Sequence, residues 1–369
     1  WVCVPLMAGL AVACATGKGD ALVWAMGGAS FTALAFIISF FIKASAQTKT
    51  VLFWKLLFFA GIFCLGGGYY LWRVPPTPAQ WRAYPPRELT VTVEVDRVFG
   101  PTGRKYPSVS GLGYLRQVPE FAKELTGRRI SFQMFGDGQG VLPGALIEMT
   151  GVAEAVDPAR DGFSRYLDKN GIGLALRRAV LVKMQKPAGA FRQKCAELNT
   201  RFEEILSAGF SRENAGVFAA MMLGKTRALS AGQKQSFTLT GTMHLFAISG
   251  LHVALVGGIL FLLLRTCRVS ARLLPWAVLA LLFMYVAVTG FAPSALRAFL
   301  MIAFIWGAYW AGRPNDGLVG LVMSAVCILI WDPSFIGNTG FQLSYAVVAS
   351  IFLYGLPLAK FFDRRFQPY

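Results

Sequence analysis

The sequence predicts an α-helical polytopic membrane protein with a small all-β domain inserted outside the membrane. Only 15% of its 369 residues are charged, 55% are hydrophobic and the mean hydropathy is +0.52, whereas an ordinary soluble domain has about 25% charged residues. Apolar runs near both ends approach the roughly 20 residues that cross a bilayer as a helix. Between these runs, apolar and polar residues alternate with the period of a β-strand. The composition excludes an intrinsically disordered chain, a collagen-like chain and a disulfide-stapled fold.

Three apolar segments at the N-terminus are expected to span the membrane, over residues 1–15, 21–42 and 51–72. The second segment has no charged residue, and the third has only Lys55, near one end, where a lysine can reach the interface. No signal-peptide pattern is evident, so we expect the first segment to be a span. The chain begins at Trp1 rather than at a methionine, from which we expect a fragment or a processed N-terminus.

Residues 73–187 are expected to form an extracytoplasmic β-domain. A proline-rich stretch at its start cannot continue a helix, and residues 89–98 then alternate apolar with polar. About five short strands in roughly 100 residues predict a small β-barrel, of which an OB-like barrel is the first choice and a sandwich is the alternative. The further strands are expected over residues 129–135, 146–156 and 173–182.

Helical periodicity returns after the β-domain. Residues 188–242 form an amphipathic helical linker that is too charged to span, and we expect it to lie at the membrane surface or against the barrel. Residues 243–369 are expected to hold the remaining transmembrane helices. These spans are expected over residues 243–264, 274–289, 292–311, 317–331 and 341–358.

The basic residues predict an orientation and leave an excess to explain. The short loops on one side of the eight expected spans hold nine Lys or Arg residues, and those on the other side hold Lys18 alone. By the positive-inside rule, residues 73–242 lie outside the cytoplasm. This segment carries 24 Lys+Arg against 15 Asp+Glu, although a translocated domain needs no basic residues for orientation. The excess indicates either a surface that attracts polyanions or a mildly basic solvated surface.

The sequence indicates neither a disulfide framework nor a metal centre. Residues 73–187 contain no cysteine, and the chain has no Cys-x-x-Cys motif. Its only histidines are His244 and His252, too few for the usual ligand patterns. We therefore expect no metal and no cofactor.

Both histidines lie at the start of an apolar run, on either side of Ser249 and Gly250. In a continuous helix, His244 and His252 would share a face, and Ser249 would be adjacent to His252. Gly250 permits a close backbone approach or a local break. Three interpretations remain open: a Ser–His pair of an intramembrane hydrolase, polar groups along a transport path, or polar contacts between helices. The hydrolase is the least favoured, because no acid or oxyanion-stabilising group is apparent.

Further polar residues occur at the same ends of other apolar runs. Arg297 lies about one turn inside its run, where an arginine needs a partner or water, and Asp332 is the nearest plausible counter-charge. Gln342 and Ser344 open the last run. Because all these groups fall at the external side, they favour a shared entrance or gate. The predicted translocation or gating residues are His244, Ser249, Gly250, His252, Arg297, Asp332, Gln342 and Ser344.

Several separated motifs occur in the order and approximate spacing of one known family. They are Leu223-Gly224-Lys225, residues 244–252 (HLFAISGLH), Thr289-Gly290-Phe291 followed by Ser294 and Arg297-Ala298, Asp332-Pro333, and residues 340–344 (GFQLS). Together they resemble the competence domain of ComEC-type DNA-uptake proteins. Residues 162–167 with 170–172 also resemble the OB-like extracytoplasmic domain of that family.

The resemblance implies a multi-pass channel component in the bacterial inner membrane that admits one strand of transforming DNA. Its implied partners are single-stranded DNA, membrane lipids, a DNA receptor and a cytoplasmic helicase-like motor, with self-association into a homo-oligomer. Longer members continue to a metallo-β-lactamase-like domain whose His-rich motif this sequence lacks. We therefore expect a truncated member, incomplete at the C-terminus, with no nuclease or other enzymatic activity. The alternatives are a transporter or scaffold for another anion, such as a lipid-linked precursor, and thirdly an intramembrane hydrolase.

OB-like barrels bind single strands with basic grooves and stacked aromatic side chains. The basic pairs and nearby aromatic residues of the β-domain are therefore the predicted DNA-binding set. They are Arg104, Lys105, Tyr106, Tyr114, Arg128, Arg129, Phe132, Arg177 and Arg178.

Overall fold

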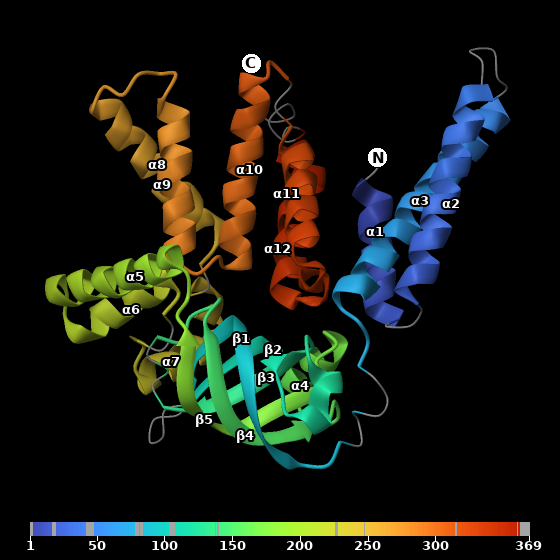
Figure 1. The fold of residues 1–369 in the computed structure, drawn as a ribbon. Coiled ribbons are helices and arrows are strands. Elements are labelled where there is room, and N and C mark those ends of the chain that lie inside the picture. Colours follow the sequence, from blue (N-terminus) through green and yellow to red (C-terminus); the bar gives the residue numbers. More distant parts are fainter. Residues whose placement is uncertain are drawn as a thin grey trace. The chain divides into compact units, whose positions relative to one another are not determined.

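The computed structural model in Figure 1 divides the chain into two compact units. One unit combines Trp1–Pro76 with Leu300–Tyr369, and the other is Thr77–Phe299. The described residues are 3–16, 20–41, 48–77, 81, 84–102, 108–136, 138, 140–225, 228–246, 248–313, 316–359 and 361.

The unit Thr77–Phe299 begins with five strands that close into a barrel in the order β1-β2-β3-β5-β4. Neighbouring strands are antiparallel, except that β3 and β5 run parallel. The small β-barrel is therefore confirmed, and the sandwich alternative is wrong because the sheet closes on itself. The strands are β1 Arg87–Thr102, β2 Ser108–Gln117, β3 Arg129–Phe135, β4 Leu146–Ala155 and β5 Leu174–Lys186.

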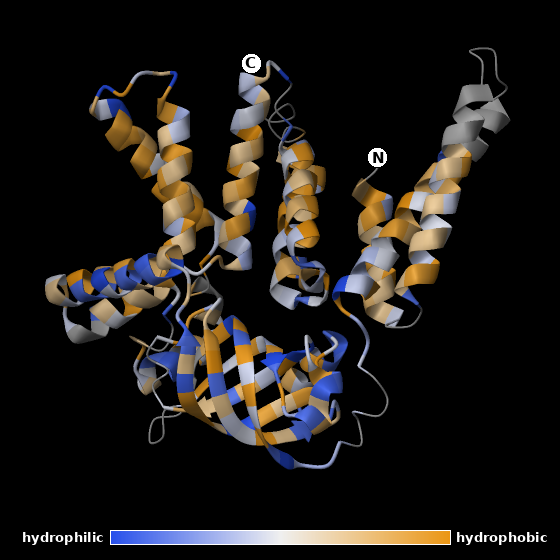
Figure 2. Cartoon of the chain, viewed as in Figure 1, coloured by the Kyte–Doolittle hydropathy of each residue, from blue (hydrophilic) through white to orange (hydrophobic). Residues whose placement is uncertain are grey.

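Buried hydrophobic residues from all five strands fill the barrel. Hydrophobic and hydrophilic residues alternate along the strands (Figure 2). Val93, Phe132 and Ile147 are among the most completely buried side chains. Phe132 packs over Gly111 of the neighbouring strand, where an added Cβ would lie 2.4 Å from the Cζ of the ring. The glycine therefore leaves the space that the aromatic ring occupies.

Two short helical segments join the strands. The 3₁₀ segment η2 (Glu120–Leu125) connects β2 to β3, and α4 (Gly162–Lys169) connects β4 to β5. Asp161 caps α4 by accepting the N–H of Ser164, which satisfies one of the unpaired donors of the first turn. Leu167 of α4 is buried in a small cluster beside the main barrel core.

The amphipathic linker forms helices that pack on an apolar helix of the same unit. Cys195 of α5 is buried against Ala287 and Val288 of α9, and the side-chain amide of Asn199 donates to the Val288 carbonyl at 2.8 Å. This contact was not among the expected ones, which were the membrane surface and the barrel. The helices of this region are α5 Ala190–Gly209, α6 Arg212–Leu223, α7 Ala231–Leu239, η4 Thr242–Phe246, α8 Gly250–Thr266 and α9 Leu274–Val288.

Among the residues that the structure describes, the secondary-structure elements of the other unit are all helical. Glycines let α2 and α3 approach closely: a Cβ on Gly61 would lie 2.5 Å from Cγ2 of Thr32. Such small-residue contacts are typical of helices that pack in a membrane. Helix α10 (Pro293–Trp310) begins in the unit Thr77–Phe299 and ends in this one. The other elements of this unit are α1 Cys3–Thr16, α2 Ala21–Phe41, α3 Thr48–Arg73, α11 Gly317–Trp331, η5 Pro333–Gly337, α12 Thr339–Ser350 and η6 Ile351–Gly355.

Every predicted span contains a helix, but most of these helices are shorter than predicted. Two stretches of described helix are long and apolar enough to cross a membrane, Lys55–Arg73 and Thr339–Ala359, and six further apolar helices are shorter. The predicted span over residues 243–264 is wrong in one respect. Its first residues form the separate segment η4, and α8 begins only at Gly250.

Candidate functional site

The start of α8 is built by a reciprocal capping arrangement. Ser249 is the N-cap, and its hydroxyl accepts the backbone N–H of His252. In return, Nδ1 of His252 accepts the backbone N–H of Ser249 at 3.2 Å and lies 2.8 Å from the Ser249 hydroxyl. Serine is a preferred N-cap residue because its oxygen satisfies a donor that the helix leaves unpaired. Ser249 and His252 are therefore adjacent, as predicted, and together they define where the helix begins.

The break before Ser249 separates the two histidines. His244 lies in η4 and His252 in α8, so the continuous helix in which they would share a face is not present. An apolar run conceals such a break, because the serine that caps the new helix also occurs within helices.

The first two turns of α10 pack against this start of α8. An added Cβ on Gly250 would lie 3.2 Å from Nη2 of Arg297 and 3.5 Å from Cβ of Ala298. The Ser294 hydroxyl donates to the carbonyl of Ile248, just before the cap. Gly250 thus gives a close approach to the arginine as well as following a break. Arg297 is only 7% exposed, so it is a buried cation.

Residues from the preceding linker contact or lie near the residues just before the start of α8. Gly224 ends α6 in the left-handed conformation (φ 72°), and a Cβ on it would lie 3.1 Å from Ile248. Lys225, next in the chain, pairs with Glu203 of α5, and Phe237 packs on Phe246 with ring centroids 4.7 Å apart. Neither Ser294 nor Glu203 was predicted to have a site role. Only the fold brings them to residues that are distant in the sequence.

This arrangement concentrates positive charge. The N-terminal ends of helices α8 and α10 each have a partial positive charge from their aligned peptide dipoles, and the guanidinium of Arg297 lies beside the first of them. Backbone N–H groups at a helix start and an arginine are the groups that bind phosphate oxygens in proteins. The start of α8 with Ser294 and Arg297 is therefore suited to contact an anion.

The other predicted gating residues belong to the unit that combines Trp1–Pro76 with Leu300–Tyr369, and they have local roles there. Asp332 ends α11 and accepts the N–H of Ser334 at the start of η5. The side-chain amide of Gln342 donates to the carbonyl of Ile336 at 2.7 Å, and Ser344 is half-buried on α12. The pairing of Arg297 with Asp332 stays a prediction.

The barrel residues predicted to bind DNA differ in availability. Arg129 pairs with Asp96 and Arg177 pairs with Glu154, so both guanidinium charges are already partly neutralised. Phe132 is 2% exposed in the barrel core, so the prediction that it stacks on bases is wrong. Its position on the inward face of β3 explains why, since a strand alternates its faces. Arg104, Lys105 and Tyr106 lie outside the described residues.

Three of the predicted barrel residues remain accessible. Arg128 lies over the ring of Trp81, with its Cζ 5.4 Å from the centroid. Tyr114 is half-buried beside Arg129, and Arg178 is exposed with a φ of 51°. Among the described residues, no group of three or more His, Cys, Asp or Glu side chains could hold a metal ion.

Comparison with known proteins matches part of the chain to one family. Residues 221–369, which include the start of α8, match the family described as competence protein. The chain is 27% identical over 260 residues to ComE operon protein 3 of Bacillus subtilis, an alignment that covers 67% of this chain and 33% of the relative. It is 32% identical over 149 residues to competence protein ComA of Neisseria gonorrhoeae, covering 38% of this chain and 21% of that relative. No solved structure matches the chain.

The protein is mostly helical, with an inserted five-stranded barrel and a polar cluster at the start of an apolar helix; these features define its class. Within that class, the chain is similar to ComEC-type competence proteins, and residues 221–369 match the competence protein family. It spans about a third or less of the length of these relatives.

Proposed function

We propose that the chain forms part of a channel through which single-stranded transforming DNA crosses the bacterial inner membrane. The observation that carries the proposal is the packing of Gly250 at the start of α8 against the buried Arg297 of α10. This cluster lies within the segment that matches the competence family. A single strand has one phosphate per nucleotide, and a helix start beside a guanidinium gives such phosphates a binding step in an otherwise apolar helical region.

The barrel supports the proposal as a collecting surface. Its five strands close in a Greek-key order that is compatible with an OB fold, and OB folds bind single strands through cations and stacked aromatic rings. Arg128, Arg178 and Tyr114 are the accessible candidates. Because residues 73–242 would lie outside the cytoplasm by the distribution of Lys and Arg, the barrel would meet DNA before the membrane does.

The cellular setting is part of the same proposal. The chain would cross the inner membrane several times, self-associate, and act with a DNA receptor outside and a helicase-like motor inside. We assign no catalytic step and no cofactor to its residues.

An intramembrane hydrolase is the third candidate, and one observation favours it: the Ser249 hydroxyl lies 2.8 Å from Nδ1 of His252. This distance is suitable for a nucleophile and its base. However, the same Nδ1 also accepts the Ser249 backbone N–H, which is the geometry of a helix cap. The capping function accounts for the pair without chemistry. Transport of another anion is compatible with the same positive site. The test distinguishes it from DNA transport because the labelled substrate is DNA.

The matched glycines of α8 give the test. In a strain that lacks the gene, uptake of labelled DNA is measured after complementation with the wild type, Gly250→Val or Gly258→Val. Valine at position 250 must displace Arg297, whereas nothing lies within 4 Å of a Cβ at Gly258. We expect uptake to fall at least about tenfold with Gly250→Val, while the Gly258→Val variant behaves as the wild type at equal protein level.

Two results would contradict the proposal. Normal DNA uptake in the deletion strain would exclude a role in transformation. Equal uptake by Gly250→Val and wild type would exclude the start of α8 as the transport site. If the deletion left uptake intact but impaired the cell envelope, the protein would act on another anion.

A further inference from the structure

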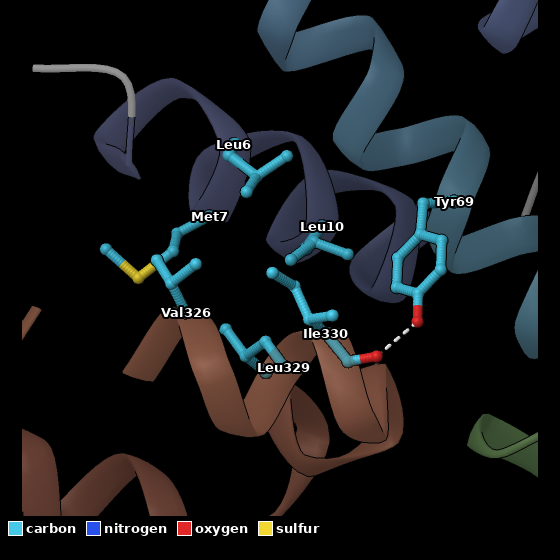
Figure 3. A pocket seen from close by; sticks show the side chains of 7 residues that line it. All are labelled: Leu6, Met7, Leu10, Tyr69, Val326, Leu329 and Ile330. Atoms are coloured by element: carbon cyan, nitrogen blue, oxygen red, sulfur yellow. Dashed lines mark hydrogen bonds between the residues drawn. The ribbon is translucent and has the colours of Figure 1, made fainter. Parts of the chain in front are cut away.

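A crevice lies between α1, α3 and α11 within one of the two units (Figure 3). Its volume is about 210 Å³, and apolar side chains such as Leu10, Val326 and Leu329 line it. Tyr69 contributes the single hydroxyl, which donates to the carbonyl of Ile330. The lining therefore offers contact surface for hydrocarbon and little for a polar ligand.

A cation and aromatic side chains follow at one end of the crevice. Arg73 lies one helical turn beyond Tyr69 on α3, and its Nη2 donates to the carbonyl of Trp331 at 3.0 Å. Trp72 and Trp331 are 71% and 77% exposed. Tryptophan, tyrosine and arginine gather where hydrocarbon meets the headgroup region of a bilayer. Arg73 is also the last residue of the candidate span that begins at Lys55.

We propose that the crevice binds one acyl chain of an anionic phospholipid whose phosphate lies against Arg73. Apolar cavities of about 150 Å³ accept benzene, so about 210 Å³ accommodates a stretch of acyl chain. Drug-sized polar ligands use larger pockets, of about 300–1,000 Å³, with several directing polar groups. A guanidinium has five N–H donors, and the bond to Trp331 uses one of its nitrogens, which leaves donors for phosphate oxygens.

The acidic residue near this site has a role of its own. Asp332 follows Trp331 in the chain, and its carboxylate accepts the N–H of Ser334. The negative charge of Asp332 reduces the local positive potential. Because this charge cannot attract an anionic headgroup, the preference for an anionic lipid depends on Arg73. The phospholipid would hold α1 and α3 to α11, because each of these helices contributes side chains to the crevice.

This inference rests on the membrane location in the proposed function and not on DNA transport. The test therefore measures lipid directly. The full chain is reconstituted in nanodiscs of equal parts phosphatidylglycerol and phosphatidylcholine, and retained lipid is counted by native mass spectrometry after mild release. A wild-type protein that retains no phospholipid but supports normal DNA uptake would overturn only this inference. A wild-type protein that retains phospholipid but has no role in DNA uptake would overturn only the transport proposal.

Two exposed residues of α11 provide matched variants. Ile330 lines the crevice and is 58% exposed, whereas Val319 on the same helix is 57% exposed and lies outside the lining. We expect Ile330→Trp to lower the fraction of protein with a retained phospholipid at least about fivefold, and Val319→Trp to leave it unchanged. Val326→Trp, which fills the crevice from a second position, should act as Ile330→Trp does. Equal retention by all three variants and the wild type would overturn the proposal.

The headgroup contact is tested at Arg73. Arg73→Gln should retain a lipid but lose the enrichment of phosphatidylglycerol over phosphatidylcholine, while Arg73→Lys should keep part of it, because the charge remains. Added inorganic phosphate should not displace the lipid, since the acyl chain contributes most of the contact. Unchanged enrichment in Arg73→Gln, or displacement by phosphate alone, would exclude the proposed binding mode.

Discussion

The Ser249 hydroxyl contacts two groups of His252. It accepts the backbone N–H of that residue and lies 2.8 Å from the ring Nδ1. Nδ1 also accepts the Ser249 backbone N–H, so the histidine ring completes a reciprocal capping box. The hydroxyl therefore contributes to the start of the helix.

Substitution of Ser249 distinguishes capping from catalysis. Ser249→Ala should destabilise the protein by about 1 kcal/mol, because the first turn loses its acceptor, whereas Ser249→Asn retains a good N-cap. We expect Ser249→Asn to support DNA uptake close to that of the wild type, with thermal unfolding reporting the loss in Ser249→Ala. A folded but inactive Ser249→Asn protein would instead favour a chemical role for the hydroxyl.

Single residues were predictable from the sequence only where their neighbours are local. The contact of Ser249 with His252 follows from a spacing of three residues, and the structure has it. The approach of Arg297 to Gly250, and that of Ser294 to Ile248, depend on the packing of α10 on α8. No local pattern contains that information. A glycine in an apolar run indicated a close approach without indicating which side chain approaches.

Among the elements, the strands with clear alternation were predicted well, and β2, which contains both Gly111 and Gly113, was not. The interpretation placed a strand at residues 129–135, where the structure has β3, but gave no range for β2. Gly111 and Gly113 lower the strand propensity of β2, yet a Cβ on either would lie 2.4 Å from a side chain of the barrel core. The requirement for glycine comes from the closed core, which the sequence of one strand does not contain.

Helix α4 has a pH-dependent cap. The Ser164 backbone N–H holds the pKa of the Asp161 carboxyl below its usual value of 3.8. A carboxyl whose folded pKa is lowered stabilises the fold above its unfolded pKa and loses that effect as the pH falls through the folded value. Asn also caps a helix, so Asp161→Asn removes the charge and keeps the cap.

We therefore expect the stability difference between wild type and Asp161→Asn to be constant above about pH 5 and to shrink below about pH 4. Unfolding of the barrel, followed by near-ultraviolet circular dichroism across this range, measures it. A difference that increases on acidification would contradict the assigned cause, because it would require a raised carboxyl pKa.

At the scale of the whole molecule, composition predicted the helical class with an inserted barrel, while the lengths of the helices came from the structure. Composition cannot show where an apolar run is interrupted, as the separation of η4 from α8 illustrates. The distribution of Lys and Arg does predict an orientation for the whole chain. It predicts that the loop over residues 265–272 lies inside and residues 73–242 lie outside.

Thiol labelling tests this orientation. Cys267 is exposed in the predicted inner loop, whereas Cys195 is buried. In intact spheroplasts, a membrane-impermeant maleimide should leave Cys267 unlabelled until the membrane is permeabilised. A cysteine introduced at the exposed Ser207 of α5 should react at once. The opposite pattern would reverse the orientation and place the barrel in the cytoplasm.

The closed order of the barrel strands has a consequence for the tendency of this domain to aggregate. An open sheet exposes a row of unpaired N–H and C=O groups on which other chains can pair and aggregate, and closure removes that row. With no cysteine in residues 73–187, the domain also has no thiol to oxidise or mispair. Its folding therefore requires neither an oxidant nor a disulfide isomerase, and the barrel should reach the same structure in a reducing or an oxidising compartment.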